Sequence, residues 1–235
     1  MSFPKVVSRE EWLEARLALL EKEKVVTRAF DEIHAARQAL PAVKMEKDYR
    51  FTAEDGSELT LLDLFEGRRQ LIVRHFMWAP GNVVGCPGCS MQTDSIGALE
   101  HIWARDTSLV LVSRAEPADY AAFKKRMGWT IPWYSSFGSE FNYDFEVSSD
   151  KGESPGVSAF IRNDDGEVFH TYSVYDRGGE IFKNFYNYLD ITHLGRQEAQ
   201  LEHPWDWWRL KDEYDKEDAH VAGDNHWNGT RFKKS

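Results

Sequence analysis

Two cysteines, Cys86 and Cys89, are the only ones among the 235 residues, and they lie three positions apart. With Pro87 and Gly88 between them they form a Cys-Pro-Gly-Cys motif. At the start of a helix this spacing brings the two sulfurs within bonding distance, and the free N–H groups of the first turn stabilise a thiolate. A thiolate is the species that attacks a disulfide or a peroxide. The motif therefore predicts a redox-active dithiol.

The residues around the motif predict a strand before it and a helix after it. Gln70–Phe76 is a nearly continuous apolar run, typical of a buried parallel strand, and residues 77–90 are rich in glycine and proline, typical of a loop. The apolar residues that follow have the spacing of the buried face of one helix: Met91, Ile96, Leu99, Ile102 and Trp103. At this position Cys86 precedes the first full turn, whereas Cys89 lies about one turn inside. We therefore expect Cys86 to be the more exposed, more acidic and attacking thiol, and Cys89 to be the buried, resolving one.

The rest of the pattern predicts an α/β fold, in which a mixed sheet carries helices on both faces. Buried strands, helices and hairpins are expected, in chain order, at Tyr49–Thr52 with Glu58–Leu61 (hairpin), Leu61–Phe65 (one helical turn), Leu109–Ser113 (strand), Pro117–Met127 (helix), Val157–Ile161 with Val168–Val174 (hairpin) and Glu180–Leu189 (helix).

Extensions flank this central region, and we expect three parts: a helical arm over residues 1–45, the α/β domain over 46–190 and an aromatic, charged extension over 191–235. Ser8 and Glu11 form a capping box at the start of the arm. Apolar residues that include Trp12 and Leu17 then recur at helical spacing. This stripe packs either on its own domain or on a second subunit, and we expect a homodimer because the central fold is complete without the arm.

Arg114 is a candidate site residue because of its place after a predicted strand. If the strands Gln70–Phe76 and Leu109–Ser113 are parallel neighbours, their carboxyl ends meet at one edge of the sheet, where α/β folds place their sites. Arg114 would then stand near the dithiol and help to hold a thiolate. The alternative is that Arg114 pairs with a surface carboxylate.

The sequence as a whole resembles the bacterial thioredoxin-like family called domain of unknown function 899, within the thioredoxin superfamily. The residues that carry this resemblance span nearly the full length: Gly85–Ser90, Ser113–Ala115, Met127–Trp133 with Ser135 and Ser136, Asp144 and Phe145, Tyr188–Ile191 with Gly195 and Arg196, and Asp212–Tyr214. The resemblance implies a thioredoxin-like fold and thiol redox activity, and it implies no particular substrate. It also implies that Pro155, directly before the Val157–Ile161 strand, has a cis peptide bond and faces the dithiol.

Several functions remain open at this stage. A thiol–disulfide oxidoreductase would use Cys86 to attack. A peroxiredoxin-like peroxidase would use Cys89 instead, although Cys86 then replaces the threonine found three positions before the peroxidatic cysteine of peroxiredoxins. A metal site would combine both cysteines with His75 or His170. A redox sensor that is not an enzyme would bind its partners on the arm and on the Trp205–Trp208 segment. In the remaining alternative the two cysteines have no chemical role and are small buried apolar residues.

The amino-acid composition limits the classes of molecule that this protein is expected to bind. The formal charge of −10 disfavours nucleic acid and anionic lipid surfaces. No apolar run is long enough to span a bilayer, and the first residues lack the apolar stretch of a signal peptide. We therefore expect a cytoplasmic protein that needs no cofactor. Its partners would be a disulfide or peroxide substrate, carried by a protein or a small molecule, and an unidentified reductant.

Overall fold

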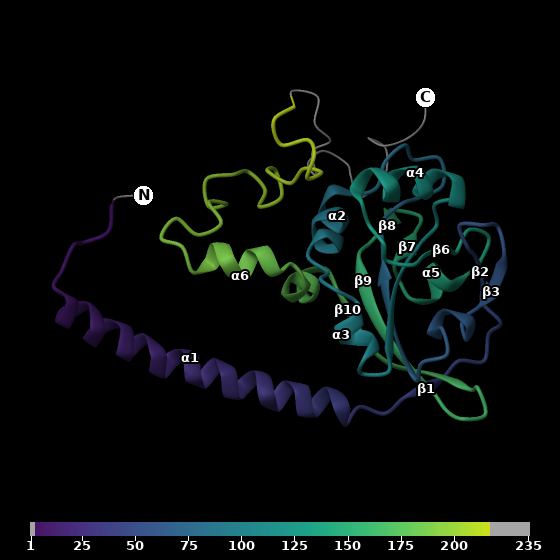
Figure 1. Ribbon diagram of the computed structural model, residues 1–235, viewed down its shortest axis with the longest axis horizontal. Helices are drawn as coiled ribbons and strands as arrows, with labels where there is room; N and C mark the ends of the chain where they lie inside the picture. The colour runs from purple at the N-terminus through teal and green to yellow at the C-terminus, as the bar shows by residue number, and fades with distance from the viewer. Residues whose placement is uncertain (1–2, 217–235) are drawn as a thin grey trace.

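The computed structural model describes residues 3–216. Its sheet contains eight strands in the spatial order β1-β10-β9-β4-β5-β6-β2-β3 (Figure 1). In chain order the strands of this sheet are β1 (Val43–Lys44), β2 (Arg50–Thr52), β3 (Glu58–Thr60), β4 (Gln70–His75), β5 (Thr107–Ser113), β6 (Trp133–Ser135), β9 (Gly156–Arg162) and β10 (Val168–Tyr175). A separate two-stranded ribbon pairs β7 (Ser148–Ser149) with β8 (Gly152–Glu153).

The centre of the sheet has the thioredoxin-like arrangement. Strands β4, β5 and β6 are parallel neighbours, β9 is antiparallel to β4, and β10 is antiparallel to β9. The connection from β4 to β5 contains α2 (Pro87–Asp94) and α3 (Glu100–Trp103), and the connection from β5 to β6 contains α4 (Pro117–Met127). The predicted mixed α/β fold is therefore confirmed, and the carboxyl ends of β4 and β5 share one edge.

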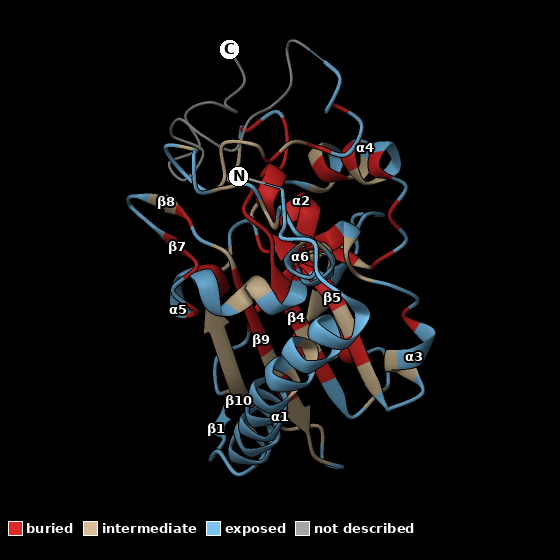
Figure 2. Ribbon diagram, turned by 90° about the vertical axis from the view of Figure 1, so that its left-hand side faces the viewer, coloured by how far each residue is buried: buried red, intermediate tan, exposed pale blue. Residues whose placement is uncertain are grey.

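Helices cover both faces of this sheet. On one face Cys89 of α2, Leu99 before α3 and Tyr120 of α4 join one buried core with Phe76 and Trp133. On the other face, the short helices η1 (Asp63–Phe65) and α5 (Phe141–Asp144) contribute to a second core with the alternate residues of β4 and β5. Strand alternation separates the two cores, because neighbouring side chains of β4 point to opposite faces. Figure 2 shows the central strands buried between the two layers.

The N-terminal helix α1 (Arg9–Gln38) begins at the predicted capping box, where Ser8 and Glu11 exchange side-chain hydrogen bonds. It projects away from the sheet, to the lower left in Figure 1, and has no buried residue (Figures 1 and 2). Trp12 and Leu17 are 45% and 52% exposed, so the stripe does not pack on its own domain. The prediction that it packs on a second subunit stays open.

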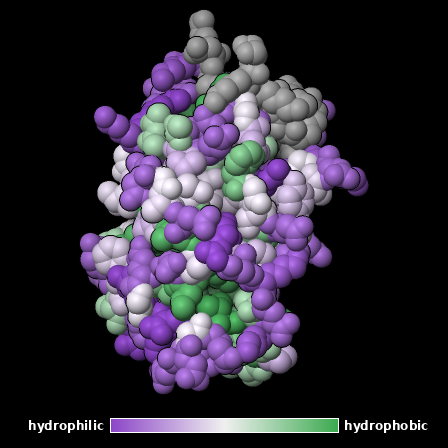
Figure 3. All heavy atoms as spheres, turned by 90° about the vertical axis from the view of Figure 1, so that its right-hand side faces the viewer, coloured by the Kyte–Doolittle hydropathy of each residue, from purple (hydrophilic) through white to green (hydrophobic). Residues whose placement is uncertain are grey.

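The remaining surface is mostly polar on the side that carries β2 and β3, where Figure 3 shows hydrophilic residues over most of the face and hydrophobic residues in hollows of its lower half. Within the described residues, no helix is long and apolar enough to cross a membrane.

Three elements differ from the prediction. The single helix expected from Met91 to Trp103 is two helices, α2 and α3, with a break over residues 95–99. The expected loop over residues 77–90 ends early, because Pro87 begins α2 and its fixed φ suits the first helical position. The expected helix Glu180–Leu189 is instead a 3-10 segment, η2 (Asp176–Phe182), followed by α6 (Asn184–Asp190). Beyond α6 the chain packs back towards α2 up to residue 216. The rest of the predicted extension, residues 217–235, lies outside the described part of the chain.

Candidate active site

The dithiol lies at the start of α2, directly beyond the carboxyl end of β4. Cys86 is the N-cap residue and Cys89 lies in the first turn. Both are free thiols, their side chains are 4.0 Å apart, and they are only 4% and 1% exposed. Gly88 between them is required by packing, because a Cβ built there would lie 2.5 Å from Cζ3 of Trp208. The strand and the helix therefore hold the two sulfurs together beneath a tryptophan ring.

Cys89 is the more acidic thiol of the pair. Burial raises its pKa, but three groups outweigh burial: the Cys86 thiol donates a hydrogen bond to its sulfur, the Arg74 guanidinium adds positive charge and a hydrogen bond, and the Met77 N–H donates at 3.5 Å. Together they lower the pKa of Cys89 to about 6. The hydrogen bond to Cys89 and burial raise the pKa of Cys86 above its ordinary value.

The expectation that Cys86 is the more acidic thiol is therefore wrong. Cys86 is only slightly more exposed than Cys89, and both thiols are buried. The physical reason is that the start of the helix does not determine which thiol has the lower pKa. The side chain of Arg74 and the N–H of Met77, both from the strand side of the site, act on the Cys89 sulfur.

Arg74 was missed by the sequence analysis. It lies near the end of β4 on the same face as Phe76, is 3% exposed, and donates hydrogen bonds to the backbone oxygens of His75 and of Gly156, the latter at 3.0 Å. A signal was present in the sequence, since Arg74 is a charged residue inside an otherwise apolar strand that leads into the cysteines. Charges are rarely buried without a partner, so such an arginine indicates a buried anion nearby.

Arg114 follows β5 at the expected edge of the sheet, but its ion-pair partner is a carboxylate and not a thiol. Its guanidinium donates to Glu153 at 2.9 Å and stacks on Tyr143 at 4.8 Å from the ring centroid. Arg114 is also not among the described residues that line the dithiol cavity. The expected place beside the dithiol is therefore corrected: Glu153, a 7% exposed carboxylate on the unforeseen β7–β8 ribbon, binds this arginine instead.

Pro155 lines the same cavity as both cysteines, directly before β9. The expected cis bond is absent, since no peptide bond in residues 3–216 is cis. Ser154 N–H donates to the Val147 oxygen at 2.9 Å, which extends the ribbon pairing up to the residue before Pro155. The trans form is also the more stable one for an X–Pro bond.

A cavity of about 310 Å³ opens on the dithiol. Its floor includes Arg74 and the cysteines, and its roof is the C-terminal part of the chain. Trp208 lies over Gly88, donates from Nε1 to the Tyr186 hydroxyl at 3.0 Å, and is only 9% exposed. The Trp205–Trp208 segment, expected as a possible docking surface, therefore places Trp208 against the dithiol helix.

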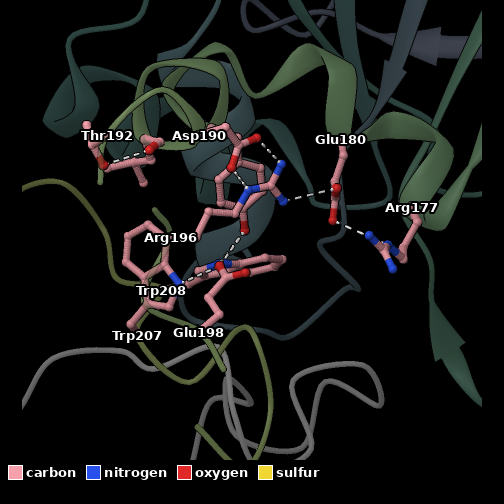
Figure 4. Close-up of polar contacts among 10 residues, drawn as sticks. Arg177, Glu180, Asp190, Thr192, Arg196, Glu198, Trp207 and Trp208 are labelled. Carbon is pink, nitrogen blue, oxygen red and sulfur yellow. Dashed lines mark hydrogen bonds and ion pairs between the residues drawn. The ribbon is translucent and has the colours of Figure 1, made fainter. Parts of the chain in front are cut away.

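Polar contacts hold this roof in place (Figure 4). Arg196 binds Asp190 at 2.7 Å and Glu180 at 3.2 Å, and Glu180 also pairs with Arg177 at 3.5 Å. Glu198 accepts hydrogen bonds from Trp207 Nε1 and from the Tyr186 hydroxyl (Figure 4 draws these contacts). The segment after α6 is therefore bound to η2 and α6 rather than loosely attached.

The histidines considered as metal ligands lie elsewhere. His75 Nε2 is 2.8 Å from Ser158 Oγ, and both His75 and His170 pack on Phe145, in contact with the core on the other face of the sheet. In residues 3–216, no group of three or more histidine, cysteine, aspartate or glutamate residues is placed to hold a metal ion.

Comparison with known proteins gives a family and several distant structural likenesses. Peroxiredoxin Q from Xanthomonas campestris has 13% sequence identity and a TM-score of 0.49, over 62% of this chain and 93% of the other. The peroxidoxin BcpB from Mycobacterium tuberculosis has 16% identity and a TM-score of 0.46, over 62% and 94%. A 2-Cys peroxiredoxin from Plasmodium vivax has 16% identity and a TM-score of 0.40, over 63% and 94%.

A search of curated proteins gives no match. A family model described as "Bacterial protein of unknown function (DUF899)" matches residues 1–214, which is most of the chain. The chain therefore belongs to this family, as its sequence resemblance predicted.

Proposed function

We propose that this protein is a dithiol oxidoreductase that reduces small hydroperoxides, with Cys89 as the attacking thiol and Cys86 as the resolving one. The observation that carries the proposal is the set of contacts at the Cys89 sulfur. The Arg74 guanidinium, the Met77 N–H and a second thiol surround this sulfur in a small cavity, and these contacts lower its pKa. A thiolate at neutral pH, a fixed positive charge and a neighbouring thiol are the groups that such a reaction needs.

The reaction would proceed in two balanced steps. The Cys89 thiolate attacks the terminal oxygen of the hydroperoxide, the O–O bond breaks, and its electron pair leaves on the alkoxide, which takes a proton to become the alcohol. Cys89 is then a sulfenic acid. The Cys86 thiol displaces its hydroxyl group, so that a Cys86–Cys89 disulfide forms and water leaves. An external dithiol would return both cysteines to the reduced state.

The roof over the dithiol favours a small substrate. The packing of Trp208 on Gly88, and the low exposure of both sulfurs, leave little room for a disulfide carried on a folded protein. A cavity of about 310 Å³ instead suits a small molecule.

Thiol–disulfide exchange is a second candidate, because a Cys-Pro-Gly-Cys pair with side chains 4.0 Å apart can also accept and transfer a disulfide. Two substrates separate these functions. The full chain, with dithiothreitol as reductant, is given cumene hydroperoxide in one assay and hydroxyethyl disulfide in the other. We expect steady consumption of the hydroperoxide that is lost in Cys89→Ser. Turnover of the disulfide alone would favour exchange and contradict the peroxidase proposal.

A further inference from the structure

Lys183 is a buried cation of the cavity that the proposed reaction does not use. It joins η2 to α6, lines the cavity together with both cysteines, and is 8% exposed. Its Nζ lies 3.5 Å from the ring centroid of Trp208 and 5.5 Å from that of Tyr186. Within the described residues, no hydrogen bond or ion pair joins this ammonium to a carboxylate.

The carboxylates in the cavity wall are engaged elsewhere or lie outside. Glu180 is bound by Arg177 and Arg196, and Glu198 accepts from Trp207 and Tyr186, as Figure 4 shows. Asp176 also lines the cavity, but it is exposed and makes no ion pair with the lysine. The aromatic rings therefore face the Lys183 ammonium without neutralising it.

An unpaired ammonium in a buried site is unfavourable unless an anion joins it. Burial lowers the pKa of Lys183 to about 8, while the negative charge of the thiols opposes this change. The Cys89 thiolate is one such charge, but Arg74 already acts on it. A ligand with a negative charge would therefore supply the counterion that Lys183 lacks among residues 3–216.

The other walls of the cavity are largely apolar. Met77, Val157, Val174, Trp205 and Trp208 contribute to its lining, and its volume lies at the lower end of the range of small-molecule sites. A ligand that matches these walls has a short apolar body and one negatively charged end. A carboxylate suits the ammonium of Lys183, since a charge-assisted hydrogen bond in a site shielded from water is stronger than one in solution.

We propose that the cavity binds small alkyl hydroperoxides that carry a carboxylate, with Lys183 holding the carboxylate and the hydroperoxide group directed to Cys89. This inference rests on the proposed function for its reactive end. The carboxylate site itself depends only on Lys183 and the apolar walls. It is therefore testable by binding, without turnover.

The test measures binding of ω-hydroxyhexanoate, the alcohol product of such a hydroperoxide, and of its uncharged methyl ester by calorimetry. The full chain is used with its dithiol kept reduced. We expect the acid to bind about ten-fold or more tightly than the ester to the wild-type protein. Lys183→Met should remove this preference, and Lys183→Arg should keep most of it. Lys125→Met, the matched control, should keep it because Lys125 is exposed and does not line the cavity.

Equal binding of acid and ester by the wild-type protein would overturn the proposal, even if Lys183→Met does not fold. A preference that persists in folded Lys183→Met would overturn the role of Lys183. Turnover of ω-hydroperoxyhexanoate is measured in parallel. Selective binding of the acid without any turnover would support the carboxylate site and contradict the peroxidase function, so the two failures are distinguishable.

Discussion

Removal of the Arg74 charge should raise the pKa of Cys89, and Arg74→Met tests this in a Cys86→Ser background, where Cys89 is the only thiol. The hydroxyl group that the Cys86→Ser change introduces can still donate a hydrogen bond. Arg74 acts on the Cys89 sulfur both by charge and by a hydrogen bond, and it is 3% exposed, so solvent screens little of this effect. We therefore expect the pKa of Cys89 to rise towards that of an ordinary thiol when Arg74 is replaced.

The size of the expected effect decides which measurement is useful. At pH 7 a thiol with a pKa of about 6 is roughly 90% thiolate, and one with a pKa of about 8.5 is roughly 3% thiolate, a change of about 30-fold. As the pKa of the thiol rises from about 6 to about 8.5, its thiolate becomes about ten-fold more nucleophilic, because the Brønsted coefficient is about 0.4–0.5. The two effects nearly cancel, so the alkylation rate at pH 7 should fall by only about three-fold.

The informative assay is therefore the pH dependence of alkylation of Cys89 by iodoacetamide, followed by mass spectrometry. We expect the midpoint to lie below that of an ordinary thiol with Arg74 present, to move well upward in Arg74→Met, and to stay low in Arg74→Lys, which keeps the charge. Circular dichroism checks that each variant is folded. An unchanged midpoint in folded Arg74→Met would refute the assignment of the low pKa to this arginine.

Three further outcomes are expected. Arg114→Gln should lower the free energy of unfolding by about 1–3 kcal/mol, because it weakens the pairing of the buried Glu153, and denaturant titration should show this while the alkylation midpoint of Cys89 stays in place. Burial and the charge of Arg74 lower the pKa of His75 to about 3, so below pH 6.5 the unfolded chain binds a proton that the folded chain does not. The free energy of unfolding should therefore fall as the pH drops from about 6.5 towards 3. Acid titration of folded His75→Gln should show a smaller fall, and an equal fall would contradict this. The arm Ser8–Leu40 should hold a homodimer through its exposed apolar stripe, and light scattering that shows only monomer at micromolar concentration would contradict this.

The fold was predictable where local pattern decides the structure. The apolar run Gln70–Phe76 forms β4, and the strand Leu109–Ser113 pairs with it in parallel as expected. The Cys-Pro-Gly-Cys motif does begin a helix, because proline suits the first helical position. These features depend on residues near one another in the chain, and the strand order then follows from the few topologies available to such elements.

The chemistry within the site was less predictable, because it depends on contacts between distant segments. Nothing in the spacing of Trp208 indicates that its ring packs on Gly88. Nothing near Lys183 in the sequence indicates that it lines the cavity of the two cysteines. Arg114 was placed at the correct edge, but its partner Glu153 lies on a ribbon that the pattern did not reveal. The boundaries at residues 45 and 190 stay predictions, although the segment after residue 190 forms part of the cavity roof.

The most direct test of the central claim is to find which sulfur a hydroperoxide oxidises. Cys86→Ser and Cys89→Ser are each treated with one equivalent of cumene hydroperoxide in the presence of dimedone, and the modified peptide is identified by mass spectrometry. If Cys89 is the attacking thiol, the Cys86→Ser protein carries the sulfenic acid adduct on Cys89, and the Cys89→Ser protein carries almost none. An adduct on Cys86 in the Cys89→Ser protein, with Cys89 unmodified in its counterpart, would contradict the account.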